Sequence, residues 1–293
     1  MRSLDRFLAE SKAGDLTAET FAQWCQRQQH LSSGVLRNRM RIVRNFCLYR
    51  QRAQTDCFVP DLRLFPTPHQ PVQPYIFTDA DVARLLQTAT TLKPAPRSPL
   101  RPEVFRLAVV LLYTTGLRRS ELVRLSVGDY DPQARTLRVC ESKFHKSRVL
   151  PLSLDTTREI NAYLQARRRH KRSMSPTDPL VWNGYGQSYT GSGIWQGIRK
   201  LLHLAEIRTL QGRLPRTHDL RHAFAVNALL RWYRMGVDVH AKLPLLATYM
   251  GHVSIASTEY YLPFIEPLAA AASARFNTCY GALVTPVRRA QGG

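Results

Sequence analysis

Five prolines within fifteen residues divide this sequence into two unequal parts. They stand at positions 60, 66, 68, 71 and 74, in a stretch without helical periodicity. Proline fixes φ and lacks a backbone N–H, so this stretch cannot continue a helix or a central strand. We therefore predict a helical domain over residues 1–62, a linker over 63–75 and a second domain over 76–293. A proline-rich linker holds two domains at a defined reach, which suits a clamp.

The charge balance narrows the kinds of partner. The chain has 293 residues, with 42 Lys and Arg against 21 Asp and Glu, which gives a formal charge of +21. A field of this sign gathers a polyanion, most commonly nucleic acid, with an anionic membrane surface as the second possibility. The 44% of hydrophobic residues can build packed cores, which excludes a disordered polycation.

The sequence carries no signal for export or membrane insertion. Its longest apolar run, Leu107–Tyr113, is too short to span a bilayer, and the N-terminus leads into no apolar region. The five cysteines are scattered and form no Cys-x-x-Cys pair, so they indicate neither a disulfide framework nor a zinc knuckle. We expect reduced thiols in a cytoplasmic protein that has no membrane partner.

The N-terminal part is predicted to form helices over Leu4–Ser11, Ala18–Gln28 and Ser33–Arg52. In the third helix an apolar residue recurs at spacings of 4, 3 and 4, from Leu36 to Cys47, which gives one apolar face. The other faces carry six arginines and no acidic residue. An ordinary solvated surface is one interpretation, but unpaired arginines favour phosphate contact. We predict DNA binding by Arg37, Arg39, Arg41 and Arg44.

The second part is predicted to be helical with a single β-hairpin. Helices are expected after a cap at Thr78, over Glu103–Tyr113, Arg119–Leu125, Thr156–Arg169 and Ile194–Leu204, after His218, and over the alanine-rich stretch Glu266–Phe276. The hairpin pairs Thr136–Val139 with Arg148–Leu152 and is the only convincing sheet signal. The predicted fold class is mainly α with a small β-sheet.

Two places in the second domain put a cation at an abrupt position. Arg118 follows the glycine break at Gly116, with Glu121 placed to orient it. Lys143 stands at the hairpin tip, where an ammonium can reach a leaving oxygen. Taken alone, each is an ordinary surface residue, so these two positions matter only in combination with others.

Two further places add histidines and a tyrosine. His218 and Arg221 lie three residues apart on one helix face, so both can meet one phosphate. His218 and His222 also have the spacing of a zinc-binding helix, but no third ligand and no general-base glutamate accompany them. Tyr261 follows a Gly-His turn, nine residues after His252, and taken alone it could be a core aromatic.

Together these residues resemble the active-site pattern of the tyrosine recombinase, or phage-type integrase, family. The match rests on four boxes in the family's order: Gly-Leu-Arg-x-Ser-Glu-Leu, Lys-x-x-Lys-x-Arg-x-x-Pro-Leu, His-Asp-Leu-Arg-His, and a Gly-His turn followed by a tyrosine. The N-terminal helices are similar to that family's core-binding domain. The resemblance, closest to recombinases of bacterial transposons, implies a C-shaped clamp on double-stranded DNA.

The resemblance also implies a role for each residue. A nucleophile would form a 3′-phosphotyrosyl bond, two arginines would clamp the phosphate, a lysine would protonate the 5′ leaving oxygen, and two histidines would assist. The resemblance makes Tyr261 the nucleophile, Arg118 and Arg221 the phosphate clamp, and Lys143 the general acid. His218 and His252 would be the assisting histidines, with Glu121 and Asp219 in support. Tyr260, Arg119 and Lys146 are the neighbouring alternatives to Tyr261, Arg118 and Lys143.

Such a scheme needs no metal, because the two arginines take its place, and no nucleotide cofactor, because the phosphotyrosyl bond keeps the energy of the broken phosphodiester. An ordinary tyrosine has a pKa of about 10, and we expect a cationic pocket to lower that of Tyr261. The family further implies a homo-oligomer on DNA, four protomers in the synapse, and accessory recombination proteins as further partners. The C-terminal tail would dock on a neighbouring protomer or cap its own domain.

Two other functions remain open from the sequence. One is a type IB topoisomerase-like enzyme, which shares the nucleophile chemistry. The other is a non-catalytic DNA-binding factor derived from a recombinase, although DNA binding alone requires neither Tyr261 nor His218.

Overall fold

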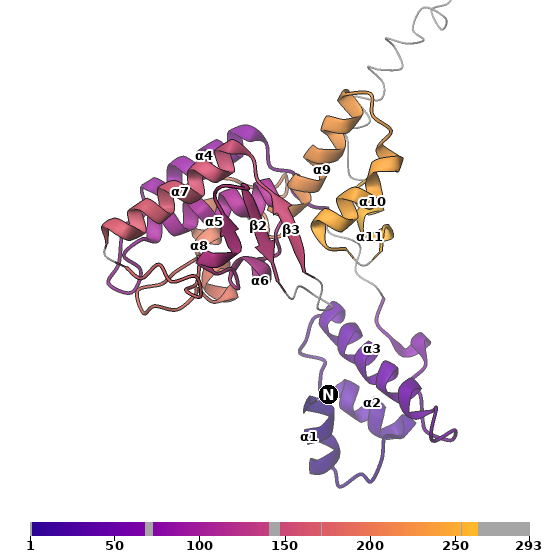
Figure 1. The fold of residues 1–293 in the computed structure, drawn as a ribbon. Helices are drawn as coiled ribbons and strands as arrows, with labels where there is room; N and C mark the ends of the chain where they lie inside the picture. The colour runs from indigo at the N-terminus through magenta and orange to yellow at the C-terminus, as the bar shows by residue number, and fades with distance from the viewer. Residues whose placement is uncertain (1, 68–72, 141–146, 171, 253, 263–293) are drawn as a thin grey trace, which may run out of the picture. The chain divides into compact units, whose positions relative to one another are not determined.

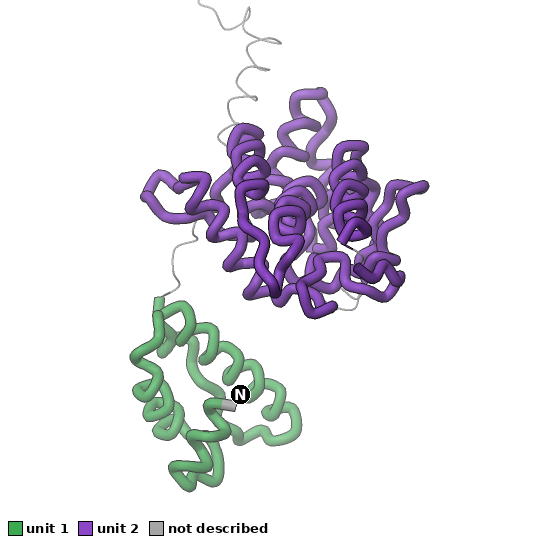
Figure 2. The backbone as a smooth tube through the Cα atoms, turned by 90° about the vertical axis from the view of Figure 1, so that its left-hand side faces the viewer, with its two compact units in different colours: residues 1–72 green, residues 73–293 purple. Residues whose placement is uncertain are grey.

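The chain divides into two compact units, residues 1–72 and 73–293, which Figure 2 shows in different colours. The computed structural model describes residues 2–67, 73–140, 147–170, 172–252 and 254–262. The division between the units falls inside the proline-rich stretch. Both ends of the predicted linker, residues 63–75, pack with the units: Phe65 lies in the core of unit 1, and Tyr75 packs against the core of unit 2.

Unit 1 is built from helices α1 (Arg2–Glu10), α2 (Ala18–Gln26) and α3 (Ser33–Arg50), followed by the 3-10 turn η1 (Leu62–Leu64). Helices α2 and α3 each end two residues before the predicted end. The apolar face predicted for the third helix is buried, and it meets aromatic side chains from α1 and α2. The buried members of this core include Phe7, Phe21, Trp24, Met40 and Val43.

Helix α5 (Arg101–Thr115) lies at the centre of the core of unit 2. Nine of its fifteen residues are buried, so it presents apolar side chains on more than one face. It packs against α4 (Asp79–Thr90), α7 (Leu154–Arg169), α8 (Gly191–Leu204) and α9 (Asp219–Arg234), as can be followed in Figure 1. The predicted cap of α4 is confirmed, because the Thr78 hydroxyl accepts the Asp81 N–H at 3.1 Å.

A small antiparallel sheet follows the short helix α6 (Arg119–Leu122) and the turn η2 (Val127–Asp129). Its strands are β1 (Tyr130–Asp131), β2 (Thr136–Val139) and β3 (Arg148–Pro151), in that order. The predicted hairpin is β2–β3, whereas β1 was missed because two residues show no alternation. Along β3, Arg148 and Leu150 face inward and Val149 is 60% exposed, so the pleat carries an arginine into the protein.

The last described elements are α9, α10 (Val239–Met250) and α11 (Ala256–Glu259), coloured orange in Figure 1. The sequence patterns gave no prediction for α10, which contains Pro244. Proline removes one helical hydrogen bond, but Val239, Leu243, Leu246 and Met250 still form a buried stripe against α9, and this packing holds the helix. The helix predicted over 266–276 lies outside the described residues.

The described chain is therefore mainly helical with one small sheet, in agreement with the predicted fold class. None of the helices in the described ranges has the length and apolar character needed to cross a bilayer.

Candidate active site

A glycine at the end of α5 positions the first site arginine. Gly116 ends the helix with φ of 62°, in the left-handed region that favours glycine. A Cβ at this position would lie 2.5 Å from Cδ1 of Phe224, so the close approach of α9 also requires glycine. The chain then turns into α6, whose first turn is preceded by Arg118. The carboxylate of Glu121 accepts the Arg118 backbone N–H at 2.9 Å and fixes this turn.

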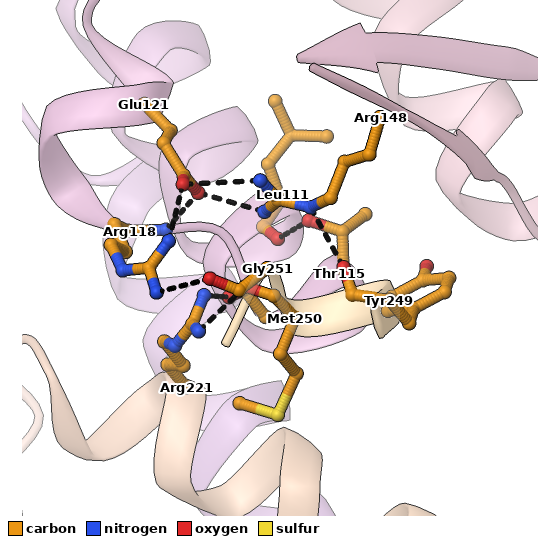
Figure 3. Close-up of polar contacts among 10 residues, drawn as sticks. Leu111, Thr115, Arg118, Glu121, Arg148, Arg221, Tyr249, Met250 and Gly251 are labelled. Atoms are coloured by element: carbon orange, nitrogen blue, oxygen red, sulfur yellow. Dashed lines mark hydrogen bonds and ion pairs between the residues drawn. The ribbon is translucent and has the colours of Figure 1, made fainter. Parts of the chain in front are cut away.

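Glu121 ties two arginines together, and Figure 3 shows its carboxylate between them. It is 1% exposed, and it accepts from Nη1 of Arg118 at 2.7 Å and from Nη2 of Arg148 at 2.9 Å. Burial raises its pKa, but the bonds from Arg148 and Arg118 outweigh burial and bring the pKa to about 2. Glu121 is therefore ionised at neutral pH and links strand β3 to helix α6.

The C-terminal end of α10 accepts hydrogen bonds from three arginines. The last carbonyls of a helix have no partner within the helix and carry its negative dipole end, so guanidinium groups stabilise them. Here three successive carbonyls each accept a hydrogen bond from a different arginine, as Figure 3 shows. The pairs are Arg148 Nε to Tyr249 O at 2.7 Å, Arg221 Nη2 to Met250 O at 2.7 Å, and Arg118 Nη2 to Gly251 O at 2.8 Å.

Arg221 is the most deeply buried of these arginines. It is 1% exposed, and its Nη1 also donates to the Gly116 carbonyl at 2.5 Å. Burial, followed by repulsion from Arg118, lowers its pKa to about 10, which still leaves it charged at neutral pH. Three arginines and one glutamate give this network a net charge of +2. Since buried charge is costly without a partner, the network favours binding of an anion.

An open cavity of 560 Å³ adjoins these arginines. It brings together side chains from the start of α6, the start of α9, the end of α10 and the α11 region. The lining residues are Arg118, His218, Arg221, His222, His252, Ala256, Ser257, Tyr260 and Tyr261.

The histidines in this cavity are neutral. Burial, followed by repulsion from Arg221, lowers the pKa of both His218 and His252 to about 4. The Nδ1 of His252 shares a hydrogen bond of 2.7 Å with the Thr258 hydroxyl, and Thr258 is fully buried. A neutral imidazole can accept a proton or donate a hydrogen bond without adding charge to the arginine network.

The two adjacent tyrosines differ in burial. Tyr261 is 3% exposed, whereas Tyr260 is 38% exposed. Burial raises the pKa of Tyr261, and attraction to Arg221 and Arg118 only partly opposes this rise. The prediction that a cationic pocket lowers this pKa is therefore wrong for the unbound site, because desolvation of the phenolate outweighs the two guanidinium groups.

The structure brings five of the six predicted catalytic side chains to one cavity. Lys143 and its alternative Lys146 lie outside the described residues. Arg119, the alternative to Arg118, is exposed and lies beside Gly191 instead of lining the cavity. Asp219 is 2% exposed and pairs with Arg216 at 2.8 Å, so its contact is with the turn before α9.

The arginines predicted to bind DNA differ in their contacts on α3. Three of the four donate hydrogen bonds within unit 1: Arg37 to the Pro66 carbonyl, Arg39 to the Gln28 side chain and Arg44 to the Pro60 carbonyl. Arg41 is exposed and bonds Asn38 one turn back on the same helix, at 3.0 Å.

Sequence reasoning gave no role to Arg148 or Thr258, and it considered His222 only as a zinc ligand, an interpretation that lacked a third ligand. Arg148 and His222 stand inside the quoted boxes, so their positions were visible, but their contacts were not. The alternation of β3 was the available signal for Arg148, since it shares a face with buried Leu150. Among the described residues, no group of three His, Cys, Asp or Glu side chains is placed to hold a metal ion.

Comparison with known proteins adds sequence relatives. The model of the phage integrase family matches residues 76–263. A Sinorhizobium fredii protein described as an integrase or recombinase, y4rB, is 32% identical over 266 residues, which cover 89% of this chain and 85% of the relative. The tyrosine recombinase XerC of Roseiflexus castenholzii is 34% identical over 189 residues, 62% of this chain and 56% of the relative.

Solved structures share the fold at low sequence identity. The Tn1549 transposon integrase in complex with transposon right end DNA has a TM-score of 0.65 at 18% identity, covering 94% of this chain and 91% of that chain. The XerH site-specific recombinase bound to palindromic difH substrate has a TM-score of 0.65 at 16% identity, covering 90% of this chain and 74% of that chain.

Proposed function

The chain belongs to the phage integrase family and is a tyrosine-type site-specific recombinase, and on this premise we propose that Tyr261 is its nucleophile and that Arg118 and Arg221 bind the scissile phosphate. Such an enzyme cleaves and rejoins DNA through a 3′-phosphotyrosyl intermediate. One observation carries the assignment: a buried tyrosine shares a cavity with two guanidinium groups of a network whose net charge is +2. A phosphodiester supplies the anion that this network favours.

The arginines stabilise the charge that develops on phosphorus. Each guanidinium has five N–H donors, and the carbonyls of α10 occupy only some of them. Because Glu121 and the end of α10 hold the groups in place before the substrate arrives, little reorganisation accompanies the reaction. The planar fork of arginine matches two phosphate oxygens, which the point charge of a lysine cannot do.

Removal of the Tyr261 proton and hydrogen bonding to the phosphate are assigned to the neutral histidines of the cavity, and protonation of the leaving oxygen to a lysine. Tyr261 must lose its proton to attack, and burial makes this costly in the free protein. His218 is neutral and lines the same cavity, so it accepts that proton as the phosphate draws the phenol in. His252 donates to the phosphate, braced by Thr258. Lys143, which stands between β2 and β3 in the sequence, protonates the departing 5′ oxygen, an assignment that rests on the motif alone.

We propose that both units bind double-stranded DNA, unit 1 as a core-binding domain and unit 2 as the catalytic domain, closing on the duplex as a clamp. Of these four arginines Arg41 is the best placed for phosphate contact, because its side chain is exposed and bonds only one turn back on its own helix. The other three are partly buried and bond more distant groups of unit 1. The Tn1549 transposon integrase was solved in complex with DNA and XerH bound to a difH substrate, which supports the proposal that this chain binds DNA.

The proposed setting is a mobile element in a bacterial cytoplasm, with the protein at the nucleoid while it is bound to DNA. Strand exchange there uses a synapse of four protomers, with accessory recombination proteins as further partners. The integrase and recombinase relatives favour this reaction over topoisomerase activity or a non-catalytic DNA-binding role.

Suicide substrates test this function. Nicked duplexes taken from the DNA that flanks the gene are incubated with the protein and run on a denaturing gel. We expect a covalent adduct that Tyr261→Phe abolishes and Tyr260→Phe retains, and that Arg118→Ala and Arg221→Ala reduce by about 100-fold or more. Tight, salt-sensitive DNA binding with no adduct on any substrate would instead identify a binding factor.

A further inference from the structure

His222 is a buried titratable group without a task in the mechanism above. It stands in the first turn of α9, one turn after His218, and is 7% exposed. Its Nδ1 is buried and has no hydrogen-bond partner among the described residues. An unpaired buried nitrogen destabilises a fold, so such a group calls for an explanation beyond stability.

The His222 ring contacts both candidate nucleophiles. Its centroid lies 5.2 Å from that of Tyr261, with the planes at 63° in an edge-on arrangement. It lies 6.0 Å from the Tyr260 ring, with the planes at 47°. Tyr261 also stacks against His252, with centroids 6.2 Å apart and planes at 17°. The Tyr261 ring is therefore in contact with two imidazoles.

Two adjacent tyrosines, Tyr260 and Tyr261, are both candidates for the nucleophile. Both phenols have the same chemistry and both line the cavity. In a helical turn, consecutive side chains point about 100° apart, so only one phenol can address a bound phosphate at a time. A rotation of the α11 region about its own axis would exchange the two, unless neighbouring side chains favour one of them.

We propose that His222 is a positioning residue that selects Tyr261 over Tyr260 as the nucleophile, through edge-on packing of its ring against the Tyr261 ring. This inference rests on the proposed function, in which Tyr261 attacks the phosphate. Edge-on contact orients an aromatic ring more strictly than aliphatic packing does, since the electron-poor edge of one ring meets the electron-rich face of another.

The electrostatics of the pocket support a neutral ring at this position. Burial, followed by repulsion from His218, Arg216 and Arg221, lowers the pKa of His222 to about 3. The ring therefore stays uncharged while the network of Arg118, Arg148, Arg221 and Glu121 binds the anion. Packing of an uncharged ring does not compete with the arginines for the phosphate.

The test maps the phosphotyrosyl residue by mass spectrometry after reaction of the full-length protein with a suicide substrate. His222→Leu keeps apolar volume without an aromatic ring, and His222→Ala removes the ring altogether. Loss of an edge-on aromatic pair corresponds to about a two- to tenfold change in preference, so both variants should raise the share of adduct on Tyr260 by that factor and slow cleavage. His222→Phe keeps a ring and removes the unpaired nitrogen, so it should fold and should retain adduct on Tyr261.

His240→Ala is the matched control, because His240 is an exposed histidine at the start of α10. Its adduct should map as in the wild type. Adduct only on Tyr261 in both His222→Leu and His222→Ala, at the wild-type rate, would overturn the inference. So would equal loss of selectivity in His222→Phe and His222→Leu, since that result assigns the effect to a nitrogen. Wild-type adduct on Tyr260, or no adduct, would instead overturn the proposed function.

Discussion

Replacing Glu121 by glutamine should strongly destabilise unit 2. Glu121 is 1% exposed and holds both Arg118 and Arg148 through its two carboxylate oxygens. Removing one member of a buried ion network costs about 3–5 kcal/mol, because the remaining charges stay buried without compensation. The pKa of Glu121 gives a second measure: its fall from the ordinary value of 4.5 to about 2 corresponds to about 3 kcal/mol.

The pH dependence of this effect follows from the same pKa. Because the folded-state pKa lies below the unfolded value, the stabilisation is present above about pH 4.5 and is lost as the pH falls through about 2. The difference in free energy of unfolding between wild type and Glu121→Gln should therefore be about 3–5 kcal/mol at pH 7 and about 2 kcal/mol smaller at pH 3.

Urea unfolding followed by tryptophan fluorescence measures this difference, since three of the four tryptophans lie in unit 2. The control is Asp155→Asn, which breaks a surface pair with Arg158 whose side chains are 87% and 76% exposed. It should change stability by less than about 1 kcal/mol. A Glu121→Gln protein within about 0.5 kcal/mol of wild type at pH 7, or a difference that does not vary with pH, would refute the role of Glu121 as the link between the arginines.

Two further substitutions test how the site and the DNA contact are built. Gly251→Ala should reduce covalent adduct formation, because a Cβ there would lie 2.9 Å from Nη1 of Arg148. The control is Gly186→Ala, which is also at positive φ but has open space around its Cβ, so it should leave adduct formation unchanged. The adduct yields of the two variants on a suicide substrate are compared. In unit 1, Arg41→Ala should weaken DNA binding with little loss of stability and lower the salt slope by about 1, whereas Arg44→Ala should destabilise the unit because it loses the bond to the Pro60 carbonyl. Equal salt slopes for Arg41→Ala and wild type, measured by titration at several salt concentrations, would exclude Arg41 from phosphate contact.

Elements with strong periodicity were predictable from the sequence. The apolar face of α3, the capped start of α4 and the β2–β3 hairpin follow from local patterns and were found at the expected residues. Helix α10 was missed because Pro244 is a local signal against a helix, while the packing that holds it comes from α9. Strand β1 has two residues, too few to show a period.

The order of motifs predicted which side chains would meet, but not how they are held. The bonds from Arg118 and Arg221 to carbonyls at the end of α10 join residues 133 and 29 positions apart, and no local pattern encodes them. The pKa of Tyr261 depends on its burial, which follows from the packing of α9, α10 and the α11 region. Likewise, Arg37 and Arg44 differ from Arg41 only because the chain returns past their side of α3 at residues 60 and 66.

The most direct test of the central claim is mass spectrometry of the DNA–protein adduct formed by the wild-type chain in the presence of EDTA. We expect an adduct in which a DNA 3′ phosphate is joined to Tyr261, formed as fast with the chelator as without it. A 5′ linkage, or an adduct that requires a divalent cation, would contradict the arginine-based mechanism.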